Sequence, residues 1–591
     1  MTIFKTIMAE LESAIAHIDS QVNIEKVTVE PPRDPSHGDL STNAAMVLAK
    51  TLGMNPRELA GKLIEQLQGS ENIESLEIAG PGFINMRLTG KAYFTDIKQC
   101  LKDGIEYGAL NIGKGEKVNV EYVSVNPTGP MHAGHVRGAV IGDTLCNLLE
   151  KAGYDVAREY YFNDAGTQVD VLARTAHLRY REALGEDIGE IPEGLYPGDY
   201  LKEVGQAIVE RDGEKWLNKE EAEWLVPIRT FAVDHMMTMI RQDLSLINIE
   251  HTVFTNERDI VENGTLEKAF NTLDDLGLIY TGTLPPPRGK EMTDWEPVPL
   301  TLFRSSHFGD DQDRPLKKRD GTWAYIMPDI GYHYDKIKRG FTLMINLLGK
   351  DHGGYEERIG PTVAAFSKEK AKLKVIYNGM VKVLKDGVAV KFSKRSGNII
   401  TLREMVEEVG ADAIRFFMMG RTPDSELEFD YSKVQEASKD NPVFYVQYAH
   451  ARCCSVLRHG TEMFSEKELT DDALAKVDLS LLGEAEKEMI RVLVNWPRIV
   501  EQAATAFEPH RIAFYVQEVA SAFNGWWSKG RGDATLRFLI EDNKPLTLAR
   551  LALVRATAIT LASALDVMGV KAVEEMRSDA LEEEENNAAN G

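Results

Sequence analysis

The sequence predicts an α/β domain with a parallel sheet, preceded by a small α+β domain and followed by an all-α bundle. Its 591 residues are too many for one hydrophobic core, so several domains are expected. From Lys117 onward, strand-like and helix-like segments alternate, which is typical of a parallel α/β sheet. After Lys394, amphipathic helical segments follow one another almost without interruption, which indicates a bundle.

Composition is that of a soluble globular protein. Hydrophobic residues make up 43% of the chain, and no apolar run approaches the roughly 20 residues needed to cross a membrane. Residues 1–16 resemble an amphipathic helix carrying Glu10 and Glu12 rather than a signal peptide, so we expect a cytoplasmic protein. The four cysteines include the adjacent pair Cys453 and Cys454 but no Cys-x-x-Cys, which argues against disulfides and a metal site.

The net charge of −24 argues at face value against a polyanionic partner. Part of this acidity lies near the end of the chain, where residues 574–585 hold six Glu and one Asp against one Arg. A nucleic-acid footprint needs only a local basic surface, whatever the global charge. RNA binding is therefore not excluded.

The first domain is predicted to span residues 1–112. A helix near the start is followed by a Pro-rich turn at residues 30–35 and a helix over residues 42–52. Residues 73–88 are strand-like and are interrupted by a Gly-Pro-Gly turn. This mixture predicts a small α+β fold.

The sheet domain is predicted over residues 113–369. Between about 170 and 300 the pattern becomes helical and charged, which indicates an insertion into this domain, with a linker over residues 283–299. The strand candidates are residues 118–125, 154–163, 323–327 and 341–348.

Helices dominate the remainder of the chain. Residues 370–438 form a connecting segment with a short basic loop, residues 439–576 form the bundle, and residues 577–591 form an acidic tail predicted to be disordered. Amphipathic helices are predicted at residues 405–419, 442–457, 480–507, 511–527 and 546–568.

Residues 118–143 predict a strand, a loop and a helix start that suit a phosphate-bearing ligand. A helix N-terminus presents unpaired N–H groups and partial positive charge, and His132 and His135 lie one turn apart there. A glycine at every fourth position from Gly134 to Gly142 leaves one helix face bare, so another group can approach its backbone closely. Taken alone, the pattern equally fits a strand packed on a Gly-faced helix with incidental histidines.

Two other loops could serve the same ligand. Lys391-Phe-Ser393-Lys394-Arg395 places three cations in a short segment that can neutralise phosphates, although a solvated surface loop would look the same. Gly349-Lys-Asp351-His352 follows a predicted strand, and open α/β sheets bind ligands at the carboxyl ends of their strands. An ordinary strand-to-helix turn is the alternative for the second loop.

A further carboxylate lies near an aromatic residue. Pro328 suits the first turn of a helix, which places Asp329 at a helix start and Tyr325 at the end of a preceding strand. Such a carboxylate is commonly a helix cap. Beside an aromatic ring, it also offers a guanidinium a bidentate acceptor and a face for stacking.

Two of these motifs resemble those of a known enzyme class. His132-Ala-Gly-His135 resembles the His-Ile-Gly-His signature of class I aminoacyl-tRNA synthetases, and Lys391-Phe-Ser393-Lys394-Arg resembles their Lys-Met-Ser-Lys-Ser loop. The second motif departs from the consensus at two positions but retains both lysines and the serine. The resemblance implies a Rossmann-like catalytic domain with a helical insertion.

Within that class, the chain is similar to the arginyl-tRNA synthetase family over nearly its full length. Met576 resembles the methionine at which that family ends, although fifteen residues follow it here. The stretches that carry the similarity are Glu121-Tyr-Val-Ser124-Val-Asn126-Pro127, Tyr160-Tyr-Phe-Asn-Asp164-Ala-Gly-Thr-Gln168, residues 311–318, 320–325, 441–452 and 81–88.

The resemblance implies attachment of L-arginine to tRNA(Arg) through an arginyl-adenylate, with ATP as substrate and Mg²⁺ accompanying it. The implied catalytic residues are His132, His135, Lys391 and Lys394. The implied ATP contacts are Pro127, Gly129, His132, Gly134, His135, Gly349, Asp351, His352, Lys391, Ser393 and Lys394. The implied arginine contacts are Glu121, Ser124, Asn126, Tyr325, Asp329 and His352. The implied tRNA contacts are Tyr445, Gln447, Tyr448, Arg452 and Met576.

The same resemblance assigns a task to each domain and implies a monomer without a membrane partner. Residues 1–112 would contact the D-loop side of the tRNA, residues 370–438 its stem, and the bundle its anticodon arm.

Two alternatives remain open. One is another ligase of the same class, but a cysteinyl enzyme would need a zinc site that the cysteine spacing does not offer, and a ligase without tRNA would not need the bundle. The other is a non-catalytic tRNA-binding paralogue. Retention of both histidines and both lysines argues against the paralogue.

Overall fold

The computed structural model describes residues 2–284, 298–390, 400–436 and 441–576, and the chain divides into two compact units. One unit contains residues 1–110, 437–506 and 511–591. The other contains residues 111–436 and 507–510.

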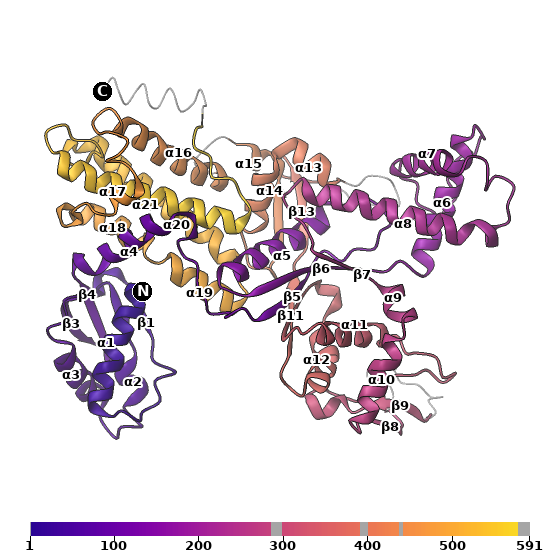
Figure 1. The fold of residues 1–591 in the computed structure, drawn as a ribbon, viewed down its shortest axis with the longest axis horizontal. Coiled ribbons are helices and arrows are strands. Elements are labelled where there is room, and N and C mark those ends of the chain that lie inside the picture. Colours follow the sequence, from indigo (N-terminus) through magenta and orange to yellow (C-terminus); the bar gives the residue numbers. More distant parts are fainter. Residues whose placement is uncertain (1, 285–297, 391–399, 437–440, 577–591) are drawn as a thin grey trace. The chain divides into compact units, whose positions relative to one another are not determined.

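A five-stranded parallel sheet forms the centre of the unit that contains residues 111–436 (Figure 1). The strand order is β12-β11-β5-β6-β7, and every neighbouring pair is parallel. This confirms the predicted α/β domain. The strands are β5 (Lys117–Glu121), β6 (Asp155–Phe162), β7 (Val253–Asn256), β11 (Leu343–Gly349) and β12 (Lys372–Asn378).

Connections in this sheet run in opposite directions from its middle. The chain leaves β5 toward β6 through α5 (Ala133–Lys151), and it later leaves β11 toward β12 through α12 (Tyr355–Ser367). Because such crossovers are right-handed, these two helices cover opposite faces of the sheet. The reversal creates a crevice at the carboxyl ends of β5 and β11, where open α/β sheets bind ligands.

The structure corrects the prediction of an uninterrupted helical insertion. β7 pairs with β6 in the central sheet, so it divides the region between residues 170 and 300 into two parts. The first part comprises α6 (Thr167–Ala183), α7 (Tyr200–Asp212) and α8 (Glu221–Ser245). The second comprises α9 (Glu257–Glu262), α10 (Thr265–Asp275) and an antiparallel sheet of β8 (Ile279–Gly282), β9 (Leu300–Phe303) and β10 (Arg314–Pro315). Most of the predicted linker lies outside the described residues.

The strand predicted at residues 323–327 is wrong. Trp323 makes only an isolated bridge to Lys317, and α11 (Met327–Lys338) begins where that strand was expected to end. Pro328 lies in the first turn of α11, as predicted. A proline there favours helix over strand, because it fixes φ and donates no N–H group.

The segment after β12 is less helical than predicted and packs on α5. It forms a small sheet and three short helices, and the helix predicted over residues 405–419 is broken at Gly410, whose φ is +79°. A buried ion pair of 2.6 Å joins Arg415 to Asp143 of α5. The elements are β13 (Val381–Lys385), β14 (Val388–Ala389), α13 (Leu402–Val409), α14 (Ala411–Met418), β15 (Leu427–Asp430) and α15 (Tyr431–Gln435).

An antiparallel sheet of order β1-β2-β4-β3 organises the first part of the other unit. It contains the predicted hairpin of strands interrupted by Gly80 to Gly82. The strands are β1 (Val29–Glu30), β2 (Leu40–Thr42), β3 (Ile73–Ala79) and β4 (Phe83–Leu88). The helices are α1 (Ile3–Ile18), α2 (Ala44–Leu48), α3 (Pro56–Leu67) and α4 (Gly90–Asp103).

The predicted helical bundle completes this unit. One predicted helix, over residues 480–507, is two helices, because the chain breaks before Trp496 and Pro497. The helices are α16 (Pro442–Gly460), α17 (Asp471–Leu474), α18 (Glu484–Leu493), α19 (Trp496–Ala506), α20 (His510–Gly532) and α21 (Lys544–Met568). The buried Trp496 indole donates to the carbonyl of Tyr107 at 2.8 Å and so ties the bundle to the N-terminal part of the chain.

Helix α21 is long and apolar enough to cross a membrane by length and composition alone, with a mean hydropathy of 1.6. Within the protein, however, 83% of its most apolar stretch is buried. It is therefore the core helix of the bundle.

Candidate active site

His132 and His135 stand together at the N-terminus of α5. His132 is the N-cap residue: its Nδ1 accepts from the N–H of Gly134 at 3.2 Å, and its own N–H donates to Nδ1 of His135 at 3.4 Å. The two imidazoles stack, with centroids 3.5 Å apart. The predicted strand, loop and helix start are confirmed, and the imidazole pair lies at the positive end of the helix.

The bare face of α5 is used for packing. A Cβ atom at Gly142 would lie 2.3 Å from the Tyr122 ring, and one at Gly138 would lie 2.9 Å from the Asn378 amide. The close approach predicted from the glycine spacing is therefore made by side chains that follow β5 and end β12. This contact fixes the helix, and with it the histidine pair, against the strand ends.

A cavity of about 150 Å³ opens beside the histidines. One wall comes from the loop after β5 and the start of α5, namely Val125, Asn126, Thr128, Gly129, Pro130, His132 and His135. The remaining lining residues are Thr401 and the insertion residues Tyr196, Pro197, Gly198, Asp199 and Tyr200. Among the predicted ATP contacts, the cavity thus collects Gly129 and both histidines.

The insertion wall was missed by sequence reasoning. Tyr200, at the start of α7, donates its hydroxyl to the carbonyl of Thr128 at 2.8 Å. A Cβ atom at Gly129 would lie 3.0 Å from that hydroxyl, so the loop must be bare at this point. The Pro-Gly-Asp sequence before Tyr200 signals a turn, but it does not indicate which loop the turn faces.

The lysine loop lies outside the described residues, so Lys391, Ser393 and Lys394 are not placed. The described chain resumes at Ile400, whose carbonyl accepts from the N–H of Ala133 at 3.3 Å. Leu402 donates its N–H to the carbonyl of Met131 at 2.9 Å. The chain immediately after the lysine loop is thus hydrogen-bonded on both sides of His132.

Asp243 of α8 holds these two segments together. Its buried carboxylate accepts from the N–H of Met131 at 3.2 Å and pairs with Arg403 at 3.1 Å. Burial raises the pKa of Asp243, and these two partners act in the opposite direction. A carboxylate from the insertion therefore stabilises the histidine segment and the end of the lysine loop at once.

The predicted amino-acid side of the site begins at Glu121, the last residue of β5. Lys336 of α11 donates to Glu121 at 2.7 Å, and both side chains are buried. The same ammonium donates to Asn346 of β11 at 3.3 Å. Lys336 was not anticipated from the sequence, and it fixes one of the two carboxylate oxygens of Glu121.

The backbone after Glu121 is strained. Val123 and Ser124 have φ values of +69° and +44°, which side-chain-bearing residues rarely adopt, least of all a β-branched one. The strained turn lets the Ser124 hydroxyl accept from the N–H of Tyr161 at 3.1 Å. Asn126, exposed two residues later, donates to Gln168 at 2.9 Å. Pro127, the next residue after Asn126, is buried.

Asp329 lies in the first turn of α11 and accepts from the Tyr355 hydroxyl at 2.8 Å. Burial, together with the nearby carboxylates of Glu121 and Glu257, raises the pKa of Asp329 to about 6, while the Tyr355 hydrogen bond and Arg358 act in the opposite direction. Asp329, Glu121 and Glu257 thus form an acidic cluster that favours a cationic ligand.

Glu257 was missed because the strand that positions it was missed. It follows β7 directly and accepts from the Tyr161 hydroxyl at 3.0 Å. Burial raises the pKa of its carboxyl group. The acidic cluster therefore draws on the ends of β5 and β7 and on the start of α11.

Tyr325 does not lie at a strand end, which corrects its predicted placement. It occupies the turn before α11, and its side chain is 93% exposed. It lies four residues before Asp329 in the sequence.

The loop after β11 carries the remaining predicted nucleotide contacts. Gly349 ends the strand, and the exposed Asp351 and His352 follow in a short 3₁₀ helix, with 3.7 Å between His352 Nε2 and the Asp351 carboxylate. A Cβ atom at Gly349 would lie 2.4 Å from the exposed Asp351 carboxylate, so a side chain there would displace Asp351. Because β11 pairs with β5, this loop leaves the sheet beside the histidine loop.

The predicted tRNA contacts lie in the other unit. Tyr445, Gln447, Tyr448 and Arg452 all belong to α16, and Met576 is the last described residue. The Arg452 guanidinium lies 4.0 Å from the ring centre of Tyr448 and 4.7 Å from that of Trp527. Tyr448 is buried, and its ring helps to orient the Arg452 guanidinium.

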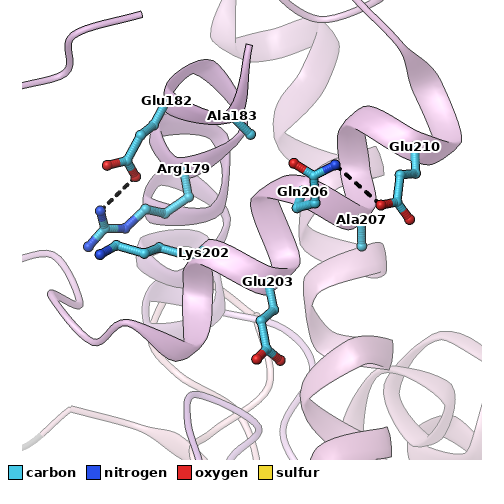
Figure 2. A pocket seen from close by; sticks show the side chains of 8 residues that line it. All are labelled: Arg179, Glu182, Ala183, Lys202, Glu203, Gln206, Ala207 and Glu210. Atoms are coloured by element: carbon cyan, nitrogen blue, oxygen red, sulfur yellow. Dashed lines mark hydrogen bonds and ion pairs between the residues drawn. The ribbon is translucent and has the colours of Figure 1, made fainter. Parts of the chain in front are cut away.

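A second hollow, of about 480 Å³, lies between α6 and α7 (Figure 2). Figure 2 shows two of its polar pairs closed on themselves: Arg179 donates to Glu182 at 2.7 Å, and Gln206 donates to Glu210 at 3.2 Å. These contacts satisfy the groups locally. Each of these contacts joins residues of a single helix, Arg179 and Glu182 in α6 and Gln206 and Glu210 in α7.

Paired imidazoles at a helix N-terminus, set at the switch point of a parallel sheet and joined to the end of a basic loop, define a class I aminoacyl-tRNA synthetase. Three family models match in succession: the arginyl tRNA synthetase N terminal domain over residues 5–88, the class I (R) tRNA synthetase catalytic domain over residues 96–452, and the DALR anticodon binding domain over residues 446–576. The chain belongs to the arginyl-tRNA synthetase family.

Similar proteins agree with this assignment. An arginine–tRNA ligase of Parvibaculum lavamentivorans is 53% identical over 584 residues, covering 98% of this chain and 100% of the relative. One of Rhodospirillum rubrum is 50% identical over 585 residues, covering 97% and 99%. The solved arginyl-tRNA synthetase of Thermus thermophilus shares the fold, with a TM-score of 0.70 at 21% identity, covering 97% of this chain and 100% of that one.

Proposed function

We propose that this enzyme attaches L-arginine to tRNA(Arg) in an ATP-dependent reaction that proceeds through arginyl-adenylate. The observation that carries the proposal is the position of the histidine pair and the acidic cluster at the same edge of one sheet, at the carboxyl ends of β5 and β7 and at the starts of helices α5 and α11. The histidine pair suits a nucleoside triphosphate, and the acidic cluster suits a cationic amino acid.

In the activation step, an oxygen of the arginine carboxylate attacks the α-phosphate of ATP, and pyrophosphate leaves. Two anions must approach, so catalysis requires positioning and charge neutralisation rather than a covalent nucleophile. His132 and His135 would bind the phosphates at the positive end of α5, and Lys391 and Lys394 would stabilise the leaving pyrophosphate. ATP is proposed to enter with Mg²⁺, which would bind phosphate oxygens of ATP and keep several water molecules as ligands.

The adenosine part of ATP is proposed to lie along the loop after β11. Gly349, Asp351 and His352 would contact the adenosine. Pro127, Gly129 and Gly134 on the histidine side and Ser393 on the lysine loop are proposed as further ATP contacts.

The arginine side chain is proposed to bind the acidic cluster. Asp329 would accept the planar fork of the guanidinium, while the Lys336-anchored Glu121, with Ser124, Asn126 and His352, would hold the amino and carboxylate groups. A lysine would leave acceptors of this cluster unpaired, so arginine is selected. For Tyr325 to cover the guanidinium, its exposed turn would have to close when arginine binds.

In the transfer step, a ribose hydroxyl at the 3′ end of the tRNA attacks the carbonyl carbon of the adenylate, and AMP leaves. We propose that α16 contacts the anticodon arm through Tyr445, Gln447, Tyr448 and Arg452, with Met576 nearby. Residues 1–112 and 370–438 would contact the D-loop side and the stem. The enzyme is proposed to act as a cytoplasmic monomer.

One assay tests the proposal directly. Purified protein, bulk tRNA and ATP are incubated with each of the twenty labelled amino acids, and attachment to tRNA is measured. Arginine alone is expected to be attached, and attachment of another amino acid would contradict the proposal. From the family resemblance we also expect ATP–pyrophosphate exchange only when tRNA is present, so exchange at full rate without tRNA would contradict that part.

A further inference from the structure

Tyr355 connects the two halves of the site. It is the first residue of α12 and lies three positions after His352 in the loop that leaves β11. Its hydroxyl reaches Asp329 on a different helix, 26 residues earlier in the chain, at 2.8 Å. The same loop therefore carries His352, a proposed nucleotide contact, and leads to Tyr355, which contacts the proposed arginine-binding residue Asp329.

The position of the Tyr355 ring depends on the backbone before it and on a neighbouring ring. Gly354 before it has a φ of +79°, a left-handed conformation that turns the chain sharply into α12. Next to it lies His333, with ring centres 6.1 Å apart, and His333 Nδ1 in turn lies 2.9 Å from the carbonyl oxygen of Asp329. These contacts favour the ring orientation in which the Tyr355 hydroxyl reaches Asp329.

The hydroxyl of Tyr355 remains a donor at neutral pH. Burial raises the pKa of Tyr355 well above its usual value, and the carboxylates of Asp329 and Glu121 act in the same direction. A neutral phenol beside an ionised carboxylate forms a charge-assisted hydrogen bond, which is stronger than one between neutral groups. It leaves the second oxygen of Asp329 available for a ligand.

Charges around Asp329 explain why this donor is needed. Glu121 from the end of β5 and Glu257 from the start of α9 both repel the ionised form, and only Arg358 of α12 and the Tyr355 hydroxyl favour it among the groups that act on it. Without the hydroxyl, the carboxylate would turn or take up a proton more readily. Either change weakens a guanidinium site.

We propose that Tyr355 is a positioning residue for arginine selection, which holds the Asp329 carboxylate in the orientation that accepts the guanidinium. The inference rests on the proposed role of Asp329 in arginine binding. Tyr355 acts through Asp329 and requires no contact with arginine itself.

Substitution Tyr355→Phe tests the proposal, because it removes the hydroxyl and preserves the ring. The KM for arginine is expected to rise about tenfold, as for loss of a hydrogen bond to a charged group, while kcat and the KM for ATP change less than about twofold. Tyr334→Phe is the matched control: Tyr334 lies on α11, and its hydroxyl accepts from Thr272 at 3.3 Å. It should leave all three constants unchanged.

The pH profile separates positioning from a merely structural effect. In the unsubstituted enzyme, the KM for arginine should rise as the pH falls through about 6, where Asp329 takes up a proton. Tyr355→Phe removes a donor to the charged form, so the rise should begin at a higher pH. An unchanged profile, or an equal loss for arginine and ATP, would overturn the proposal.

A double-mutant cycle distinguishes this proposal from the function on which it rests. In an Asp329→Asn background, Tyr355→Phe should have almost no further effect on arginine binding, measured by calorimetry on samples with matched melting temperatures. If Asp329→Asn itself leaves arginine binding unchanged, the proposed role of Asp329 fails. If Asp329→Asn weakens binding and Tyr355→Phe does so equally in both backgrounds, only the role of Tyr355 fails.

Discussion

At the scale of single residues, the site contains neighbouring carboxylates that repel one another. Asp329 has its pKa raised to about 6 by burial and by two neighbouring carboxylates. A bound guanidinium would relieve this repulsion, so part of the binding free energy would come from the destabilised empty site. On the proposed role of Asp329, specificity for arginine would depend on charge as well as shape.

Replacement of Asp329 by alanine is expected to abolish most arginine activation. It removes the proposed charge partner of a desolvated guanidinium, so the KM for arginine should rise by about two orders of magnitude or more. Arginine-dependent ATP–pyrophosphate exchange in the presence of tRNA measures this. Asp335→Ala is the control, since Asp335 lies on the same helix but pairs with Arg339. Normal exchange in the Asp329 variant would refute its assigned role.

At the scale of elements, the packing of α5 determines where the histidines stand. Gly142→Ala would place a Cβ atom 2.3 Å from Tyr122, the residue that leads into the strained Val123 and Ser124 turn. The variant should lose about 1–3 kcal/mol of stability through overpacking and should also lose activity. Thermal melting and aminoacylation rates measure the two effects.

Gly360→Ala provides the matched control. Gly360 is also helical, in α12, but an added Cβ atom there would meet nothing within 4 Å. Its melting temperature should stay the same or rise, because alanine favours helix over glycine. Equal melting temperatures for both variants would contradict the packing argument.

The insertion is expected to influence catalysis through Tyr200. Tyr200→Phe removes its hydrogen bond to the Thr128 carbonyl, so the loop between β5 and α5 should become less well positioned and kcat should fall several-fold. Tyr280→Phe removes a hydrogen bond of similar length, 2.7 Å to Asp313, in the antiparallel sheet after β7 and serves as the control. Steady-state aminoacylation compares them, and identical kcat values would exclude the proposed coupling.

Sequence patterns correctly predicted those helices and strands that are determined by residues close together in the chain. The β5 strand, the N-terminus of α5 and the Pro328 helix start follow from periodicity, capping and proline geometry. The four-residue strand β7 carries little periodicity, and only its pairing with β6, about 95 residues earlier, identifies it. Glu257, Lys336, Tyr200 and Tyr355 were missed for the same reason: their partners are distant in sequence.

At the scale of the whole molecule, residues from both ends of the chain share one unit. Trp496 is fully buried and donates to the carbonyl of Tyr107 and to the hydroxyl of Ser563. The N-terminal domain and the bundle should therefore unfold together, although nearly 400 residues separate these partners in the sequence.

Trp496→Ala is expected to lower the thermal transition of that unit and leave the other unit intact. The cavity left by the indole and the loss of its hydrogen bond to Tyr107, whose carbonyl still accepts from the Ser563 hydroxyl, should cost about 3–5 kcal/mol. Calorimetry should show one transition shifted, and arginine binding should persist while tRNA charging falls. Trp323→Ala, in the unit of the parallel sheet, should give the reverse pattern. A shift of both transitions by either variant would contradict independent unfolding.

The hydrogen bond between Ala133 and Ile400 has a consequence for the lysines that precede Ile400 in the sequence. Lys394 is six residues from this anchor, and a fully extended chain of that length spans about 20 Å. On the proposed role of the lysines, this tether would raise their effective concentration near the histidines. Each lysine could then bind the phosphates weakly and briefly at every turnover, which would allow pyrophosphate to leave quickly.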